Sequence, residues 1–241
     1  MRALVRYKKW SLVEILQNKF MPVNTEAYHS IKEQLQGKNV QLVAVSKTKP
    51  NEDIEALYAL GQRNFGENYV QELVDKAASL PSDIHWHFIG HLQSNKVKYI
   101  APFVYLIHGV DSEKLLAEIN KQAIKQNKMI ACLLQVHIAT EETKFGFDAA
   151  SLHEFIASGR LSNYSNVVIK GLMGMASFTE DKTIVENEFS TLKTIYDQTA
   201  TALNNIHFDT LSMGMSGDYA LAIGKGSNLV RIGSLLFGAR N

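Results

Sequence analysis

The chain has 241 residues, of which 46% are hydrophobic and 20% are charged, and its formal net charge at pH 7 is +1. This length fits two small domains or one (β/α)8 barrel, which typically needs about 250 residues. The near balance of charge argues against a nucleic-acid-binding face and against attraction to an anionic membrane, and no run of about 18 uncharged apolar residues is present to span a bilayer. The single cysteine, Cys132, has no partner for an internal disulfide, which favours a reducing, cytoplasmic setting.

The first twenty residues differ in charge from the rest of the chain. They contain five basic residues and one acidic residue, Glu14. A basic, acid-poor start is typical of a transit peptide, although Ser11 is the only serine in this stretch. We expect instead that residues 1–20 are an extension outside the folded domain, that translation begins at Met21, and that one domain occupies residues 21–241.

From Val23 onward, helical and strand patterns alternate with short connections. Asn51 and Asp111 are the expected N-caps of two of the helices. Alternating units of this kind predict a parallel sheet, and eight of them predict a closed (β/α)8 barrel, with a doubly wound open sheet as the alternative. In chain order we expect strands over 40–45, 63–66, 86–90, 103–110, 129–138, 167–175, 210–213 and 229–232, and helices over 25–36, 52–60, 69–80, 94–100, 111–126, 149–157 and 185–203, with a short one from 218.

The first strand is followed at once by a lysine. Residues 40–45 form an apolar, β-branched run that is typical of a strand buried on both faces, and Lys47 lies just beyond it. Ligands bind at the C-terminal ends of barrel strands, so Lys47 is a candidate nucleophile or phosphate contact. A solvated lysine that opens a loop is the alternative interpretation.

Small residues follow the seventh and eighth strands. Met215 and Ser216 come after one of them, and Gly233 and Ser234 come after the other. Backbone N–H groups at such positions can approach a phosphate, and barrels often hold a phosphate after these two strands. The four residues therefore predict a phosphate-binding cup, although small residues at turns are more often structural.

Two further patterns are rejected as sites. Residues 224–227, Gly-Lys-Gly-Ser, resemble part of a Walker loop but have a glycine after the lysine and lack the first glycine of the motif. His85, His87 and His91 have a spacing that could suggest a metal site. The first two begin their strand and so face the opposite end of the barrel, and we predict no metal there.

At this point several motifs together resemble a known family. The sequence is similar to the pyridoxal 5'-phosphate (PLP) homeostasis proteins of the YggS/PROSC type, which share the barrel of the alanine racemase N-terminal domain. The resemblance covers the chain from about Leu35 onward, and residues Gly174 to Ala176 depart from the expected β-branched character. The matching motifs are AVSKTKP at 44–50, FGENYVQE at 65–72, WHFIGHLQSNK at 86–96, KFGF at 144–147, GLM at 171–173, SMGMSGD at 212–218 and VRIGSLLFG at 230–238.

The resemblance implies a role for each candidate residue. Lys47 would form a Schiff base with the PLP aldehyde, which requires a neutral amine, and the cation of Arg231 would help to lower its pKa. Arg231 would face the pyridine nitrogen and, because a guanidinium cannot accept a proton, would leave that nitrogen unprotonated. Asn68 would contact the pocket wall, and His87 is expected to be a satisfied core histidine. The phosphate would be held by Ser216, Gly233 and Ser234, and by the backbone of Met215.

Two functions of different class follow from the resemblance. The first is a PLP carrier that holds the cofactor reversibly and passes it to apo PLP-dependent enzymes. The second is a PLP-dependent amino-acid racemase with weak activity, for which Tyr69 or His91 could act as a base inside the barrel. Alanine racemases take one acid/base group from a second domain, and this sequence ends at Asn241, directly after the last barrel element. We therefore expect a carrier that is not an enzyme, and a monomer, because a closed sheet has no edges to cover.

Overall fold

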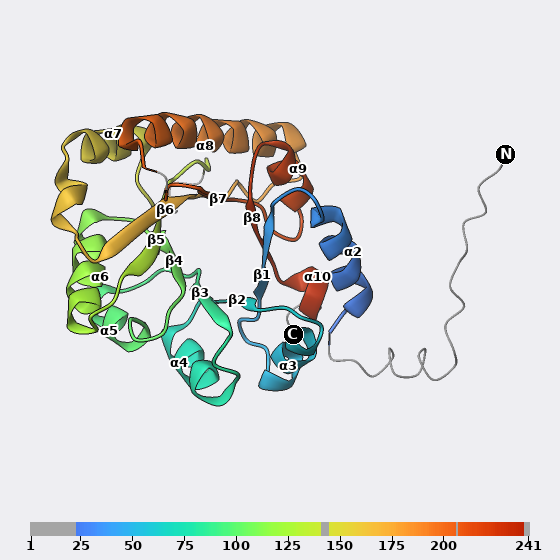
Figure 1. Cartoon of the computed structure of the whole chain (residues 1–241). Coiled ribbons are helices and arrows are strands. Elements are labelled where there is room, and N and C mark those ends of the chain that lie inside the picture. The colour runs from blue at the N-terminus through green and yellow to red at the C-terminus, as the bar shows by residue number, and fades with distance from the viewer. Residues whose placement is uncertain (1–22, 141–144, 206, 239–241) are drawn as a thin grey trace, which may run out of the picture.

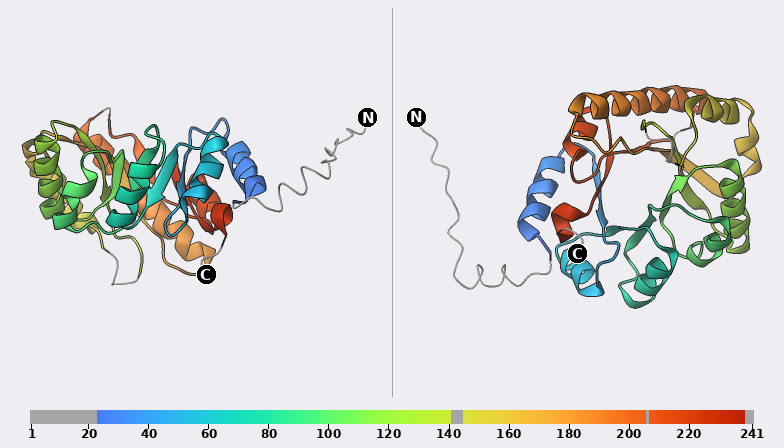
Figure 2. Two further views of the ribbon diagram at one scale, coloured as in Figure 1. Left: turned by 90° about the horizontal axis from the view of Figure 1, so that it is seen from below. Right: turned by 180° about the vertical axis from the view of Figure 1, so that it is seen from behind.

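The computed structural model describes residues 23–140, 145–205 and 207–238. Within these residues, eight parallel strands follow one another in sequence order, and the eighth pairs with the first to close a barrel. The helices form a ring outside the strands (Figure 1), and the same ring is seen from below and from behind in Figure 2. The predicted (β/α)8 barrel is confirmed, and the open-sheet alternative is wrong.

Strands and helices alternate along nearly the whole described chain. The strands are β1 Gln41–Val45, β2 Asn64–Glu67, β3 His85–Phe88, β4 Leu106–Val110, β5 Ile130–Gln135, β6 Val167–Met173, β7 Thr210–Ser212 and β8 Leu229–Ile232. The helices are α2 Thr25–Leu35, α3 Asn51–Ala59, α4 Val70–Ser79, η1 Ser94–Lys96, α5 Val97–Ile100, α6 Glu113–Lys125, α7 Ala149–Ala157, η2 Arg160–Asn163, α8 Lys182–Leu203, α9 Tyr219–Gly224 and α10 Ser234–Phe237.

The hydrophobic core has an outer and an inner part. The outer part lies between the helices and the strands and includes large buried side chains such as Phe65 and Phe189. A smaller cluster joins side chains from five strands, namely Val43, Leu106, Leu133, Met173 and Leu229. Side chains alternate along a strand, so Arg231 lies on the same face of β8 as Leu229. The guanidinium is therefore directed toward the inner cluster.

Several expected helix starts and strand ends differ from the structure. Helix α3 begins at Asn51 itself, with Pro50 at the N-cap, because the Asn51 amide donates to Ser79 Oγ at 3.1 Å instead of capping the helix. Helix α6 is capped by Ser112, since Asp111 accepts from the Ser112 hydroxyl at 3.0 Å and pairs with His91. The predicted caps at Asn51 and Asp111 are therefore wrong. The strands predicted over 103–110 and 129–138 are shorter, and the helix α10 after β8 was not predicted.

The expected extension over residues 1–20 and the expected start at Met21 lie outside the described residues. Among residues that the structure does describe, no helix combines the length and the apolar character needed to cross a membrane.

Candidate functional site

A cavity of about 390 Å³ opens at the C-terminal ends of β1, β2 and β8. All seven predicted site residues lie around it, so the structure brings together side chains from both ends of the sequence. Its lining comprises Val45, Lys47, Lys49, Asn68, Ile89, Met175, Phe178, Met215, Ser216, Gly217, Arg231, Gly233, Ser234, Phe237 and Gly238.

The lining of the cavity is positively charged. It includes Lys47, Lys49 and Arg231, and none of its described residues is acidic. The Lys49 ammonium donates to the backbone carbonyl of Phe237 at 2.7 Å, which ties this lysine to the wall. The cavity therefore suits a small anionic ligand, and Lys47 and Arg231 are the cations best placed to act on it.

Lys47 lies at the first bend beyond β1. The Ser46 amide donates to the Gly66 carbonyl at 3.0 Å and so extends the contact between β1 and β2, and the Lys49 amide donates to the Ser46 carbonyl at 3.0 Å. Strand β1 also pairs with β8, with Val43 opposite Arg231. This pairing places the ends of the two strands side by side, and with them the lysine and the arginine.

Arg231 is almost fully buried and is held by groups from two other strands. One terminal nitrogen, Nη1, donates to the carbonyl of Ser212 at 3.1 Å and to its hydroxyl at 2.5 Å, and Nη2 donates to the carbonyl of Gly174 at 3.2 Å. Burial lowers the pKa of Arg231 to about 10, and the nearby Asp218 carboxylate opposes this shift. The guanidinium stays charged at neutral pH, and these three bonds leave N–H donors for a ligand.

Behind Arg231, buried hydrogen bonds continue through the barrel interior. Ser212 Oγ lies 3.3 Å from His108 Nδ1, His108 Nε2 lies 2.9 Å from His87 Nδ1, and His87 Nε2 lies 3.1 Å from Asn64 Oδ1. Because Arg231 can only donate, we assign every proton in the direction from Arg231 toward Asn64.

Both histidines in this relay are fully buried and neutral at pH 7. Burial lowers the pKa of His87 to about 3, and it lowers the pKa of His108 well below its ordinary value, with His87 and Arg231 adding to that shift. With both ring nitrogens engaged, His87 is a satisfied core histidine, as the sequence predicted. His108 and Ser212 were not predicted, and a histidine inside an apolar strand gives no signal of its partners.

The predicted cup lies in the turns after β7 and β8. The Gly233 amide donates to Ser216 Oγ at 3.3 Å, and the Met215 amide donates to Asp218 Oδ1 at 2.5 Å. Asp218 was not predicted as a site residue; burial raises the pKa of its carboxyl group, while the Met215 amide and Arg231 lower it. The Met215 amide thus already has an acceptor, whereas the hydroxyl groups of Ser216 and Ser234 lie at the cavity wall.

Asn68 contributes a buried polar atom that needs a partner. Its Oδ1 is buried without a hydrogen bond in the structure. The backbone of Asn68 packs directly on Gly90, where an added Cβ would lie 2.3 Å from the Asn68 carbonyl oxygen. Only glycine fits there, and the close packing fixes Asn68 at the wall, where its amide can meet a polar group of a ligand.

The other residues considered from the sequence lie away from this cavity. Tyr69 is 58% exposed, and His91 pairs with Asp111 at 3.1 Å and stacks on Phe145 at 4.0 Å between ring centroids, and neither lines the cavity. Within the described ranges, no group of three or more His, Cys, Asp or Glu side chains could hold a metal ion.

The fold and this site define a barrel of the alanine racemase N-terminal type. The family described as "Alanine racemase, N-terminal domain" matches residues 25–241. The chain is 40% identical over 205 residues to a pyridoxal phosphate homeostasis protein of Pasteurella multocida, covering 84% of this chain and 87% of the relative. It is 41% identical over 208 residues to the protein of the same name from Vibrio alginolyticus, covering 84% and 88%.

A solved structure agrees with this relationship. PipY of Synechococcus elongatus, determined with PLP bound, superimposes with a TM-score of 0.80 at 35% identity, covering 88% of this chain and 99% of PipY. The chain belongs to the family of pyridoxal phosphate homeostasis proteins, and the resemblance found in the sequence motifs is confirmed.

Proposed function

We propose that this chain binds PLP as a reversible Schiff base on Lys47 and acts as a PLP carrier in cofactor homeostasis. The observation that carries the proposal is the cavity where Lys47, Arg231 and two serine hydroxyls meet without a carboxylate in the described lining. Membership of the family and the PLP bound to PipY support the choice of ligand.

The residues of the cavity fit the functional groups of PLP. Three cations suit a phosphorylated ligand, and Ser216, Ser234 and the Gly233 amide offer donors at one end of the cavity. Arg231 can donate to a ring nitrogen but cannot accept a proton from it. Lys47 supplies the amine, and the unpartnered amide oxygen of Asn68 can accept from a ligand hydroxyl. When bound, PLP would supply an aldehyde for reversible covalent attachment.

The covalent step is a condensation that releases water. The neutral amine nitrogen of Lys47 bonds to the aldehyde carbon, the carbon–oxygen double bond is replaced by a carbon–nitrogen double bond, and the oxygen leaves as water with the two amine protons. The reverse reaction returns PLP, so no other reactant is needed for loading or release.

A carrier role is favoured over a racemase role by the surroundings of the cavity. Racemisation needs an acid/base group on each face of the substrate, and neither Tyr69 nor His91 lines the cavity. The permanent charge of Arg231 would keep the ring nitrogen unprotonated and so reduce its power to withdraw electrons. We infer that the protein passes PLP to apo PLP-dependent enzymes as a monomer in the reducing cytoplasm, which fits the closed sheet and the buried thiol of Cys132.

Borohydride reduction followed by peptide mapping tests the attachment. PLP-loaded wild-type protein should give a pyridoxyl adduct on Lys47, the Lys47→Ala variant should lose it, and Lys49→Ala should keep it because the Lys49 ammonium is bound to Phe237. An adduct on Lys49 alone, or none in the wild type, would show that the attachment site is wrong.

Deuterium exchange separates the carrier from the racemase. Amino acids deuterated at Cα are incubated with the loaded protein, and we expect them to keep the label over many minutes. Loss of the label at rates of about 1 s⁻¹ or faster, which is typical of enzymes, would instead assign an enzymatic function.

A further inference from the structure

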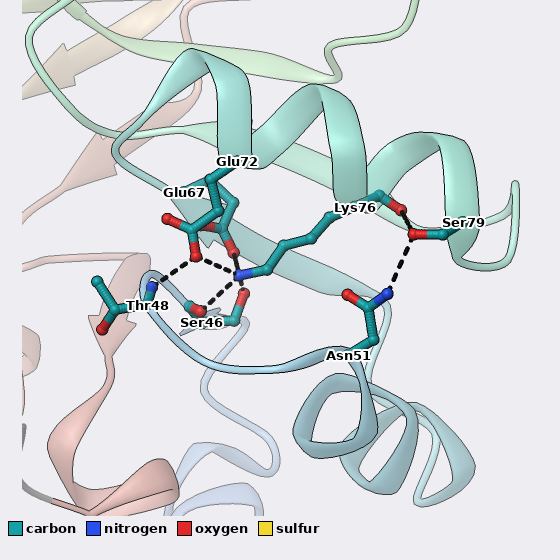
Figure 3. A network of polar contacts seen from close by, with 7 residues as sticks. All are labelled: Ser46, Thr48, Asn51, Glu67, Glu72, Lys76 and Ser79. Atoms are coloured by element: carbon teal, nitrogen blue, oxygen red, sulfur yellow. Dashed lines mark hydrogen bonds and ion pairs between the residues drawn. The ribbon is translucent and has the colours of Figure 1, made fainter.

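The bend that carries Lys47 is held on both sides by side chains from α4 (Figure 3). On one side, Lys76 Nζ donates to the carbonyl oxygen of Ser46 at 2.8 Å. On the other side, the Thr48 amide donates to Glu72 Oε1 at 2.6 Å. The backbone is therefore fixed immediately before and immediately after Lys47.

These contacts belong to one largely buried ion cluster. Lys76 Nζ also lies 2.8 Å from Glu67 Oε1 and 2.7 Å from Glu72 Oε1, so all three of its donors are used. The hydroxyl of Ser46 donates to the same Glu67 oxygen at 2.6 Å. The side chain of Glu67 is fully buried, that of Lys76 is 6% exposed and that of Glu72 is 22% exposed. The two holds on the bend are thus connected through a single ammonium group.

The cluster is costly for the fold alone. Burial raises the pKa of Glu67, against the opposing effects of Lys76 and Ser46, and Glu67 Oε2 has no hydrogen bond. Apolar residues of similar volume often stabilise a protein as well as a buried ion pair does. A cluster of this kind, placed directly beside a reactive lysine, is better explained by what it fixes than by stability.

Thr48 shows that the bend adopts a conformation it would not hold unaided. Its φ is +63°, a left-handed conformation that is rare for a β-branched residue. Such strain persists only where the surroundings enforce it. The bond from the Thr48 amide to Glu72 supplies that enforcement, because it is made by the strained residue itself.

We propose that Glu72, Lys76 and Glu67 are positioning residues that hold the Lys47 amine in line for the condensation with the PLP aldehyde. This inference rests on the proposed function. Bond formation between the Lys47 nitrogen and the aldehyde carbon, with loss of water, needs a well-placed nitrogen, and a displacement of about 1 Å can cost about 100-fold in rate. The phosphate cup and Arg231 come from β7, β8 and the turns that follow them, so the cluster leaves the initial binding of the ligand unchanged.

The test separates initial binding from covalent attachment. Initial binding is measured as the affinity for 4'-deoxypyridoxine 5'-phosphate, which has no aldehyde, and attachment as the rate of borohydride-trapped adduct at saturating PLP. Glu72→Ala should slow attachment by about 10- to 100-fold and leave the analogue affinity unchanged. Glu72→Gln should restore attachment, because its amide oxygen can still accept from Thr48. Asp75→Ala, an exposed carboxylate on the same helix whose side chain bonds only Gln71 among the contacts of its helix, is the matched control.

A second variant tests the ammonium group. Glu67→Gln combined with Lys76→Met removes both buried charges while keeping the side-chain lengths, and it should slow attachment in the same way. The inference is wrong if natively folded Glu72→Ala attaches PLP at the wild-type rate, or if its analogue affinity and attachment rate fall together. If the wild type binds the analogue but forms no adduct on Lys47, the proposed attachment itself fails, and the inference fails with it.

Discussion

The buried pair of His87 and His108 predicts a specific loss of stability in acid. Both side chains are fully buried, and burial lowers the pKa of His87 from 6.5 to about 3 in the folded protein. The unfolded chain therefore binds a proton on His87 near pH 6.5, while the folded chain does so only near pH 3. Stability attributable to this residue is complete above pH 6.5 and is lost as pH falls from 6.5 toward 3.

The size of the loss follows from proton linkage. One pKa unit corresponds to about 1.4 kcal/mol, so at about pH 5 the single proton on unfolded His87 costs the folded state about 2 kcal/mol. The same sign applies to His108, whose pKa is also lowered by burial. The relay of neutral rings behind Arg231 should therefore be one of the first features to fail in acid.

Urea unfolding at about pH 7.5 and about pH 5 measures this contribution. His87→Gln removes the titrating group and keeps a side chain that can hydrogen-bond, so its free energy of unfolding should fall less between the two pH values than that of the wild type, by about 2 kcal/mol. His153→Gln, on the exposed face of α7, should behave as the wild type does. Equal losses in His87→Gln and the wild type would refute the reasoning.

Three further substitutions test other parts of the structure. Arg231→Gln removes charged donors from the cavity and should weaken PLP binding by about 10- to 100-fold in a fluorescence titration; unchanged affinity would exclude a ring contact. Gly90→Ala should destabilise the fold by about 1–3 kcal/mol and weaken PLP binding, because its Cβ would displace Asn68, while Gly224→Ala, which meets nothing within 4 Å, should do neither in urea unfolding and titration. Asn228→Ala removes side-chain bonds between β7 and β8 and should raise amide exchange in β7 before exchange elsewhere; uniform exchange would contradict this.

The barrel could be predicted from the sequence because its signals are local. Apolar runs such as 40–45 and 229–232 alternate with helical patterns, and this alternation determines a parallel sheet. The caps could not be predicted, since they depend on competing partners. Asn51 has a side chain suited to capping, but Ser79 of a neighbouring helix offers a hydrogen bond, and Asp111 is engaged by His91 in the same way.

The candidate site shows the same division. Lys47 and Arg231 could be selected because they lie at strand ends, and the family motifs assigned them roles. Lys76 could not, because in the sequence it is one of several polar residues on an amphipathic helix. Its role depends on Glu67 being buried on β2 beneath α4, which is a property of the packing rather than of any local pattern.

Closure of the barrel and assembly of the site are the same event. Lys47 and Arg231 come from β1 and β8 and meet only because these strands pair. The neighbouring contact between β7 and β8 has a single register pair, Ser212 with Leu229, and it is reinforced by the side chains of Ser227 and Asn228. A ligand that contacts residues from β1, β7 and β8 together binds the closed barrel and not the opened one. It must therefore stabilise this weak part of the barrel wall in proportion to its affinity.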